Sequence, residues 1–409
     1  MIHPIIKEAI QKYSGELIEL RRKFHREPEL SWEEENTTTF ICDYLENLGI
    51  PYRRTKPTGV IAQIEGGLPG KTVALRGDMD ALSVEELNKE LSYASREDGK
   101  MHACGHDAHT SMLLIAAKAL NEIKDELPGN VRLIFQPAEE VAEGAKEMVR
   151  QGAVEGVDNI FGIHIWSQMP THKVSCTPGP SFASADLFKV TFKGKGGHGA
   201  MPHDCIDAAI VASSFVMNVQ TVISRTVDTQ NPAVLTIGKM VVGTRFNVIA
   251  ENAVIEGTVR CFHPETRDHI ERQLKHYAEH VASLYGASAK VEYTRGTKAV
   301  INGEYSAKLV QKVALEAFGE DVLQNEKPTM GAEDFSFYLD EVPGSFALVG
   351  SGNPEKDTEW AHHHGKFNID EDALVTGSEL YAQYAWSYLT VSQSDNPISQ
   401  KDYVETVKA

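Results

Sequence analysis

Apolar residues recur at helical spacing early in the chain. The recurring positions are Leu17, Leu20, Phe24, Phe40, Leu45 and Leu48. Polar and charged residues fill the intervening positions from Ser14 onward, and Gly49 ends the pattern. A repeat of about three to four residues places apolar side chains on one face of a helix. The pattern therefore predicts that two amphipathic helices open the chain.

Four short apolar runs follow, and most of them end in polar residues. They cover residues 59–62, 72–75, 131–135 and 160–163. The last three lead into Arg76-Gly77-Asp78-Met79-Asp80, Gln136-Pro137-Ala138-Glu139-Glu140 and His164. Helical patterns near 110–123 and 140–151 lie between the runs. Strands that alternate with helices predict an α/β fold with a mostly parallel sheet, and ligands bind at the carboxyl edge of such sheets.

The pattern changes in the middle of the chain. It predicts strands at 187–192, 234–241, 252–262 and 289–293, and helices at 206–224 and 265–285. This order is typical of an α+β domain with a four-stranded antiparallel sheet and two helices. We therefore predict an inserted domain at 185–295, flanked by the two parts of a first domain at 1–184 and 296–409. The polar stretch 391–409 is expected to be a loosely held tail.

Composition narrows the classes of partner. The chain has 40 Lys and Arg residues against 58 Asp and Glu residues, a net charge of −18, and no basic block. Binding to nucleic acid or to an anionic membrane is therefore not expected. No signal-peptide pattern or membrane-spanning apolar run is evident. The five cysteines are scattered without a framework spacing, so we expect a cytoplasmic protein without disulfides.

The segment 102–110 concentrates side chains that bind metals. It holds three imidazoles, a thiol and a carboxylate, and Cys104 and His106 are close enough for a turning backbone to direct both at one point. Imidazole and thiolate are ligands that divalent transition metals prefer. The alternative is a polar loop in which Asp107 or Thr110 caps a helix and Cys104 packs as a small apolar residue. The spacing alone leaves both interpretations open.

Further candidate ligands lie at other predicted strand ends. Glu139 and Glu140 are adjacent acids, so one can bind a metal ion while the other acts as a general base. Alternatively, they begin a helix, where the dipole favours acids. His164 is a candidate ligand or a core histidine. The three consecutive histidines at 362–364 suggest at least one more ligand.

The donor count favours two metal ions. The candidates are Cys104, His106, Glu140, His164 and one of His362, His363 and His364. Five donors exceed what one tetrahedral catalytic zinc with an open position accepts, whereas two ions that share a bridging ligand fit them. Cys104 is not expected to act as a nucleophile, because coordination to a metal ion lowers the nucleophilicity of a thiolate.

The sequence strongly resembles the metal-dependent amidohydrolases that include bacterial aminoacylases, hippurate hydrolases and indole-acetyl-amino-acid hydrolases. This group lies within the wider family of aminoacylase-type and glutamate-releasing carboxypeptidases. The matching segments, in order, are RRKFHREPELS (21–31), RGDMDAL (76–82), HACGHDAHT (102–110), QPAEE (136–140), GIHIW (162–166), GGHGAMPH (196–203), NVI (247–249), MGAEDFSFYL (330–339) and residues 363–367. The resemblance covers the chain from about Ser14 to Tyr388.

The resemblance assigns roles to particular residues. The implied metal ligands are Cys104, His106, Glu140, His164 and His363. Glu139 matches the general base, and Asp80 matches an acid that orients a ligand from behind. His198 matches a histidine thought to reach the active site of a dimer partner, and Asn247 and Arg260 match substrate-binding positions. The usual His-His-Pro is replaced by His363-His364-Gly365, so the choice among the three histidines stays open.

The implied activity is hydrolysis of N-acyl amino acids with two divalent metal ions, either zinc, manganese, cobalt or nickel. The inserted domain is then a lid that mediates formation of a homodimer. Two alternatives remain. One is a dipeptidase or carboxypeptidase that uses the same dinuclear site, and the other is a module that stores metal or senses redox state without turnover. A carboxylate at Glu139 beside the ligands favours catalysis, because a storage site needs no base.

Overall fold

The computed structural model describes residues 2–390, so the predicted tail at 391–409 lies outside the described residues. The chain divides into two compact units. Unit 1 comprises Met1–Ser181, Ile301–Lys327 and Asp334–Ala409, and unit 2 comprises Phe182–Val300 and Pro328–Glu333. The sequence pattern had placed the inserted domain at 185–295 and the segment Pro328–Glu333 in the first domain. That segment groups with unit 2 because the Ala183 N–H donates to the Thr329 carbonyl at 3.1 Å.

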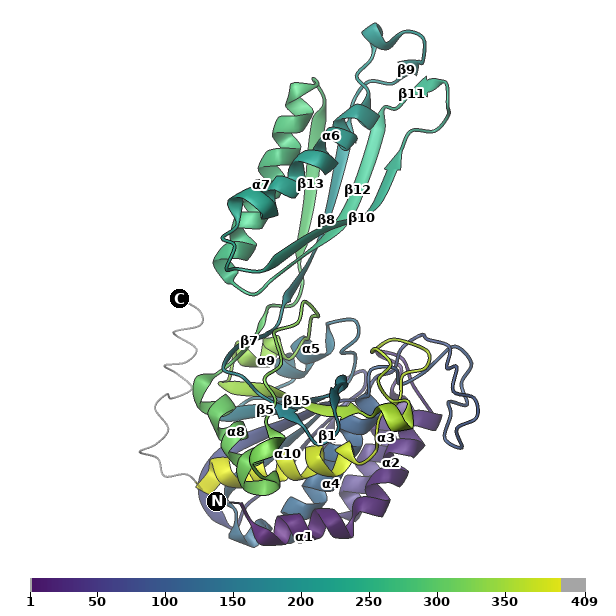
Figure 1. Ribbon diagram of the computed structural model, residues 1–409. Helices are drawn as coiled ribbons and strands as arrows, with labels where there is room; N and C mark the ends of the chain where they lie inside the picture. Colours follow the sequence, from purple (N-terminus) through teal and green to yellow (C-terminus); the bar gives the residue numbers. More distant parts are fainter. Residues whose placement is uncertain (1, 391–409) are drawn as a thin grey trace. The chain divides into compact units, whose positions relative to one another are not determined.

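Within residues 2–390, unit 1 is built on a seven-stranded sheet with the order β1-β2-β4-β3-β5-β15-β6 (Figure 1). The strands are β1 (Tyr52–Arg54), β2 (Val60–Ile64), β3 (Leu68–Asp78), β4 (Pro128–Gln136), β5 (Asn159–Pro170), β6 (Val174–Ser175) and β15 (Gly344–Gly352). The four neighbours β4, β3, β5 and β15 run parallel, whereas the pairs β1–β2, β2–β4 and β15–β6 are antiparallel. This arrangement confirms the predicted α/β fold with a mostly parallel sheet.

Helices cover both faces of this sheet. They are α1 (Pro4–Lys12), α2 (Ser14–Arg26), α3 (Glu35–Asn47), α4 (His106–Glu122), α5 (Gly144–Arg150), α8 (Glu304–Phe318), α9 (Ser336–Leu339) and α10 (Ala373–Thr390). On one face α4 and α10 pack against each other and the central strands, and on the other α5 contacts β4 and α9 (Figure 1). Residues 112–117 of α4 are fully buried, as expected for a helix that is apolar all round. No helix within residues 2–390 has both the length and the apolarity to cross a bilayer.

The first helix was missed by the sequence pattern. Two helices were predicted from Ser14 onward, but α1 precedes them and buries Ile6, Ala9 and Ile10 in the core. Pro4 stands in the first turn, where its fixed φ and missing N–H are tolerated. The helix spans only nine residues, so its three buried apolar positions cover too few turns for the periodicity to be recognised.

Unit 2 has a four-stranded antiparallel sheet with the order β10-β12-β8-β13. Its strands are β8 (Ser184–Lys193), β10 (Ala233–Val242), β12 (Asn252–Cys261) and β13 (Ser288–Arg295), and its two long helices are α6 (Ala208–Thr221) and α7 (Pro264–Leu284). Both helices pack on the sheet around a separate apolar core. The short strands β9 (Gly197–His198) and β11 (Val248–Ile249) pair with each other, as do β7 (Gly179–Phe182) and β14 (Val300–Asn302). The main elements are those predicted for the inserted α+β domain.

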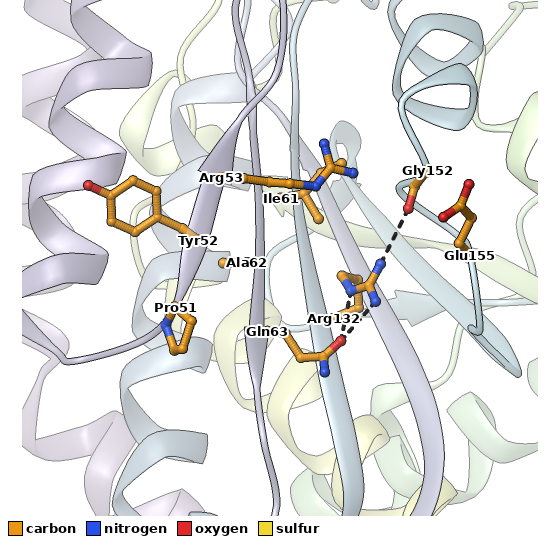
Figure 2. A pocket seen from close by; sticks show the side chains of 9 residues that line it. All are labelled: Pro51, Tyr52, Arg53, Ile61, Ala62, Gln63, Arg132, Gly152 and Glu155. Atoms are coloured by element: carbon orange, nitrogen blue, oxygen red, sulfur yellow. Dashed lines mark hydrogen bonds between the residues drawn. The ribbon is translucent and has the colours of Figure 1, made fainter.

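A surface groove of about 330 Å³ in unit 1 lies over β1, β2 and β4 (Figure 2). Arg132 on β4 donates from Nε and Nη2 to Gln63 Oε1 on β2, at 3.0 and 2.8 Å. Its Nη1 donates to the carbonyls of Gly152 and Ala153, at 3.4 and 3.0 Å. Through these bonds Arg132 ties β4 to β2 and to the segment after α5.

Candidate metal centre

The parallel strands bring two candidate residues to the same level of the sheet. β3 pairs with β5 up to Arg76 opposite Gly162. Asp78 and His164 each follow two residues later on these neighbouring strands, and both are buried. His164 was expected just after a strand, but β5 continues to Pro170 and carries it in its interior. The carboxyl edge of the sheet therefore holds acid and imidazole groups, as ligand sites in such sheets do.

The turn before α4 brings Cys104 and His106 together. Gly105 is the N-cap of α4 with a φ of 91°, a left-handed conformation that favours glycine. A Cβ at this position would lie 3.0 Å from Ile165 Cγ2, so the turn also packs tightly on β5. One ligand atom each from Cys104, His106 and Glu140 lies within 4.8 Å of the others. The segment is thus part of a donor cluster, as well as the start of a helix.

Glu139 and Glu140 lie in the turn between β4 and α5. The helix was predicted to begin at Glu140, which is wrong, because α5 begins only at Gly144. The carboxylate of Glu139 lies 3.9 Å from His106 Nε2 and that of Glu140 lies 3.8 Å from the same atom. Both side chains are only 10% exposed. The two acids therefore face one imidazole nitrogen and are not the solvated first turn of a helix.

A second donor group shares Cys104 with the first. Ligand atoms of Cys104, His164 and His362 also lie within 4.8 Å of one another. Cys104 Sγ is 3.5 Å from His164 Nε2 and 3.8 Å from His362 Nδ1. Two adjacent donor groups that share one residue have the form expected of a pair of metal positions.

The three consecutive histidines point in different directions. His363 has a φ of 67°, which is strained for a residue with a Cβ, and its Nε2 lies 3.6 Å from Glu140 Oε2. His362 faces Cys104 as described above. His364 turns away, because its ring stacks on Trp360 with centroids 4.6 Å apart. The geometry therefore leaves both His362 and His363 beside the cluster, and His362 is a neighbour that the resemblance did not single out.

Hydrogen bonds fix which ring nitrogens face the cluster. Asp80 accepts from His106 Nδ1 at 3.1 Å, and the Ile165 carbonyl accepts from His164 Nδ1 at 2.6 Å. The Nε2 lone pair of each ring is thereby turned toward the other donors. Among residues 2–390, His106 Nε2 and Glu140 Oε1 are buried without a hydrogen-bond partner. Unpaired buried polar atoms are costly, and a metal ion is the partner that suits this sulfur, nitrogen and oxygen donor set.

The field of the cluster favours a cation. Burial alone would lower the pKa of His106, but the carboxylates of Asp78 and Asp80 outweigh it and raise the pKa to about 10. Burial, opposed by His106, raises the pKa of Glu140 to about 7. Burial also holds the pKa of His164 well below its usual value. Negative charge is thus concentrated around His106, where a bound cation would take the place of the proton on Nε2, while His164 is kept neutral, as a metal ligand must be.

Three residues close to the cluster, Asp78, His109 and Arg76, were not predicted as part of the site. Asp78 accepts from His109 Nδ1 at 2.5 Å, and His109 Nε2 accepts from the Ile165 N–H at 2.8 Å. Both ring nitrogens of His109 are therefore engaged, so it supports the site and does not offer a ligand atom. Arg76 donates to Asp78 at 2.6 Å and to Gln136 at 2.8 Å. A charged residue within an otherwise apolar strand was the signal that could have identified Arg76.

Three of the predicted site residues belong to unit 2. His198 lies exposed on β9, opposite Val248 of β11. Asn247 is also exposed, and its carbonyl accepts from the Gly199 N–H at 3.0 Å. Arg260 is half-buried near the far end of β12, where it donates to the Val259 carbonyl at 3.2 Å. Unit 2 therefore brings His198 and Asn247 together, whereas Arg260 lies apart from them.

Comparison with known sequences identifies relatives over nearly the whole chain. The profile of Peptidase family M20/M25/M40 matches residues 74–387. YhaA of Bacillus subtilis (strain 168) is 41% identical over 95% of this chain and 99% of its own length. An N-acetyl-L-cysteine deacetylase of the same organism is 40% identical over 92% of this chain and 88% of its own. Thermostable carboxypeptidase 1 of Saccharolobus solfataricus is 37% identical, covering 93% of this chain and 97% of its own.

Solved structures share the fold. A protein from methicillin-resistant Staphylococcus aureus has a TM-score of 0.90 and 37% identity, covering 95% of this chain and 100% of its own. The YXEP protein of Bacillus subtilis, described as a dinuclear metal-binding peptidase of family M20, has a TM-score of 0.83 and 34% identity. That match covers 93% of this chain and 99% of the other.

Proposed function

Because the chain belongs to peptidase family M20/M25/M40, we propose that this hydrolase cleaves the amide bond of N-acyl amino acids. One observation carries the proposal: Glu139 and Glu140 both face His106 Nε2 at the edge of a Cys and His donor cluster. This arrangement provides a ligand and a separate base within one turn. The relative named as an N-acetyl-L-cysteine deacetylase supports an acylated amino acid as the substrate class.

We propose that the site holds two divalent metal ions, as described for the YXEP protein. The residues that would hold them are Cys104, His106, Glu140, His164 and His363. Bound divalent ions lower the pKa of water toward neutrality and polarise a carbonyl oxygen. The donor set of thiolate, imidazole and carboxylate suits zinc, manganese, cobalt or nickel. Asp80 keeps His106 in the tautomer that presents Nε2 to an ion.

Glu139 is the proposed general base. Its carboxylate takes a proton from the attacking water and later delivers it to the departing amide nitrogen. Its side chain is only 10% exposed, which limits exchange of a transferred proton with bulk water. No covalent acyl-enzyme forms in this scheme, because water is the nucleophile. His198 is proposed to stabilise the oxyanion, and Asn247 and Arg260 to bind the substrate.

We also propose that the protein is a cytoplasmic homodimer that pairs through unit 2. β10 is the edge strand of its sheet, and it exposes Val234, Met240 and Val241. The neighbouring helix α6 exposes Ile210 and Met217. An exposed edge strand with apolar side chains is prone to pair with another chain, and pairing with a second copy of this protein removes these side chains from water. None of the five cysteines forms a disulfide, which supports a reducing compartment. Light scattering of the purified protein would test the dimer, and a monomer would contradict it.

The test of the activity is a substrate panel with controlled metal content. The protein is stripped with a chelator and reloaded separately with zinc, manganese, cobalt or nickel. We expect metal-restored hydrolysis of N-acetyl and N-benzoyl amino acids. A second candidate is a carboxypeptidase or dipeptidase, which the relative named thermostable carboxypeptidase 1 favours. Cleavage of peptides alone would establish that alternative, and metal binding without turnover of any substrate would contradict both.

A further inference from the structure

Two buried carboxylates accept hydrogen bonds from the main-chain N–H groups on either side of Glu139. The Ala138 N–H donates to Glu34 Oε1 at 2.9 Å, and the Glu140 N–H donates to Asp80 Oδ2 at 3.0 Å. The turn is closed from within by the Ala142 N–H, which donates to the Glu139 carbonyl at 2.7 Å. Against the effect of burial, the pKa of Asp80 is lowered, mainly by its hydrogen bond with His106, so the bond from the Glu140 N–H is charge-assisted and stronger than a neutral one. Glu139 therefore stands between two anchored peptide groups.

The anchored turn is strained, so it needs support. Ala138 has a φ of 53°, a left-handed conformation that costs a residue with a Cβ about 1 kcal/mol or more. Such a conformation persists only where the surroundings determine it. Without the bond to Glu34, the peptide between Pro137 and Ala138 is free to relax to a common conformation. That relaxation changes the direction in which Glu139 leaves the backbone.

Glu34 is held in place for this contact and has no other evident task. Its side chain is fully buried, and Oε2 accepts from Thr58 Oγ1 at 2.6 Å. Although it is the N-cap residue of α3, its side chain caps no N–H of that helix. A buried carboxylate is expensive unless its oxygens are satisfied, and here the Ala138 N–H and the Thr58 hydroxyl satisfy them.

The segment that carries Glu34 also contacts Asp80, the carboxylate that accepts from the Glu140 N–H. Ser31 Oγ donates to Asp80 Oδ2 at 2.7 Å, the same oxygen that accepts from the Glu140 N–H. Leu30 forms a β-bridge with Ala81, which fixes the segment beside Asp80. One short stretch, residues 30–34, thereby reaches both ends of the turn. It lies far from the other site residues in sequence.

We propose that Glu34 is a positioning residue that holds the Ala138 peptide so that Glu139 is directed at the reacting water, while Glu140 is held separately through the bond from its N–H to Asp80. This inference rests on the proposed function, because it assumes that Glu139 is the base. Glu34 touches neither substrate nor metal in this account and acts only through the Ala138 peptide. Removing it should misdirect Glu139 and leave the ligand side chains in place.

The test compares Glu34→Ala, Glu34→Met and Glu34→Gln with Glu35→Ala, a control at the exposed neighbouring position. Ala and Met supply no acceptor for the Ala138 N–H, and Met fills the space if Ala proves unstable. Gln keeps an acceptor oxygen. We expect kcat to fall about 10- to 100-fold in Ala and Met, with KM and bound metal unchanged. Gln should restore most of the rate, and Glu35→Ala should match the wild type.

Hydrogen exchange of the Ala138 amide gives a readout that needs no substrate. We expect exchange about 10- to 100-fold faster in Ala and Met than in the wild type, and near-normal protection in Gln. Three results would overturn the inference. They are a wild-type kcat in Glu34→Ala and Glu34→Met, a loss of kcat in Glu34→Gln equal to that in the other two variants, and a loss of bound metal together with the loss of kcat. If the wild type hydrolyses no acyl amino acid, the proposed function fails instead, and exchange alone decides whether Glu34 holds the turn.

Discussion

Replacing Asp80 by asparagine changes the tautomer of His106, and its cost follows from three contacts. Asp80 Oδ2 accepts from Ser31 Oγ and the Glu140 N–H, and Oδ1 accepts from His106 Nδ1. The asparagine side chain has only one oxygen. That oxygen is best placed at the position of Oδ2, where both the Ser31 hydroxyl and the Glu140 N–H donate. Its NH2 group then faces His106 Nδ1 and stabilises the tautomer with a proton on Nε2. That proton occupies the lone pair that a metal ion requires.

To bind a metal ion, His106 must return to the tautomer with its proton on Nδ1. That N–H then faces the NH2 group of the asparagine, an unfavourable contact that costs about 1–3 kcal/mol. Metal affinity should therefore fall about 5- to 150-fold. Competition with a chromogenic chelator on metal-free protein measures this, with zinc as the probe ion. Asp98→Asn, at an exposed position, is the control for lost charge and should bind as the wild type does. A folded Asp80→Asn protein with wild-type zinc affinity would refute the reasoning about the tautomer.

Two further predictions concern stability. Arg76→Met leaves the buried carboxylates of Asp78 and Asp334 without their guanidinium partner. The free energy of unfolding measured in urea should therefore fall by about 3–5 kcal/mol. A decrease below about 1 kcal/mol would contradict the pairing. Burial raises the pKa of Glu379 on α10 to about 7. Because the folded state binds this proton more tightly, stability falls as pH rises from the unfolded pKa toward 7. Glu379→Gln should therefore raise Tm more at pH 8 than at pH 5, and an equal gain at both would contradict the assignment.

The fold was largely predictable because strand and helix patterns alternate clearly along the chain. The central strands β3, β4 and β5 were indicated by short apolar runs that end in polar residues, and the antiparallel sheet of unit 2 was indicated by longer patterned segments. The failures were local. α1 was too short to show a period, and the acid pair suggested a helix start at Glu140, although α5 begins at Gly144. Side-chain capping cannot be distinguished from ligand geometry when only the order of residues is known.

The candidate site was predictable in its residue types and less so in its supports. Cys104, His106 and the two acids stand out because such clusters are rare in sequence. The partners that orient them do not. Asp80 was named only through the resemblance, and Glu34 was missed because it acts through the Ala138 N–H, and a bond to a peptide group leaves no pattern in the side chains. The choice between His362 and His363 likewise depends on a left-handed turn at His363 that spacing does not reveal.

The central claim is that Glu139 supplies the base while Glu140 binds metal. Its most direct test measures kcat and bound metal together for Glu139→Gln and Glu140→Gln, with the N-acyl amino acid that the wild type cleaves best. The account predicts that Glu139→Gln keeps its full complement of metal and loses about 10²- to 10⁴-fold in kcat. Glu140→Gln should lose metal affinity. Hydrolysis by Glu139→Gln at the wild-type rate would contradict the account.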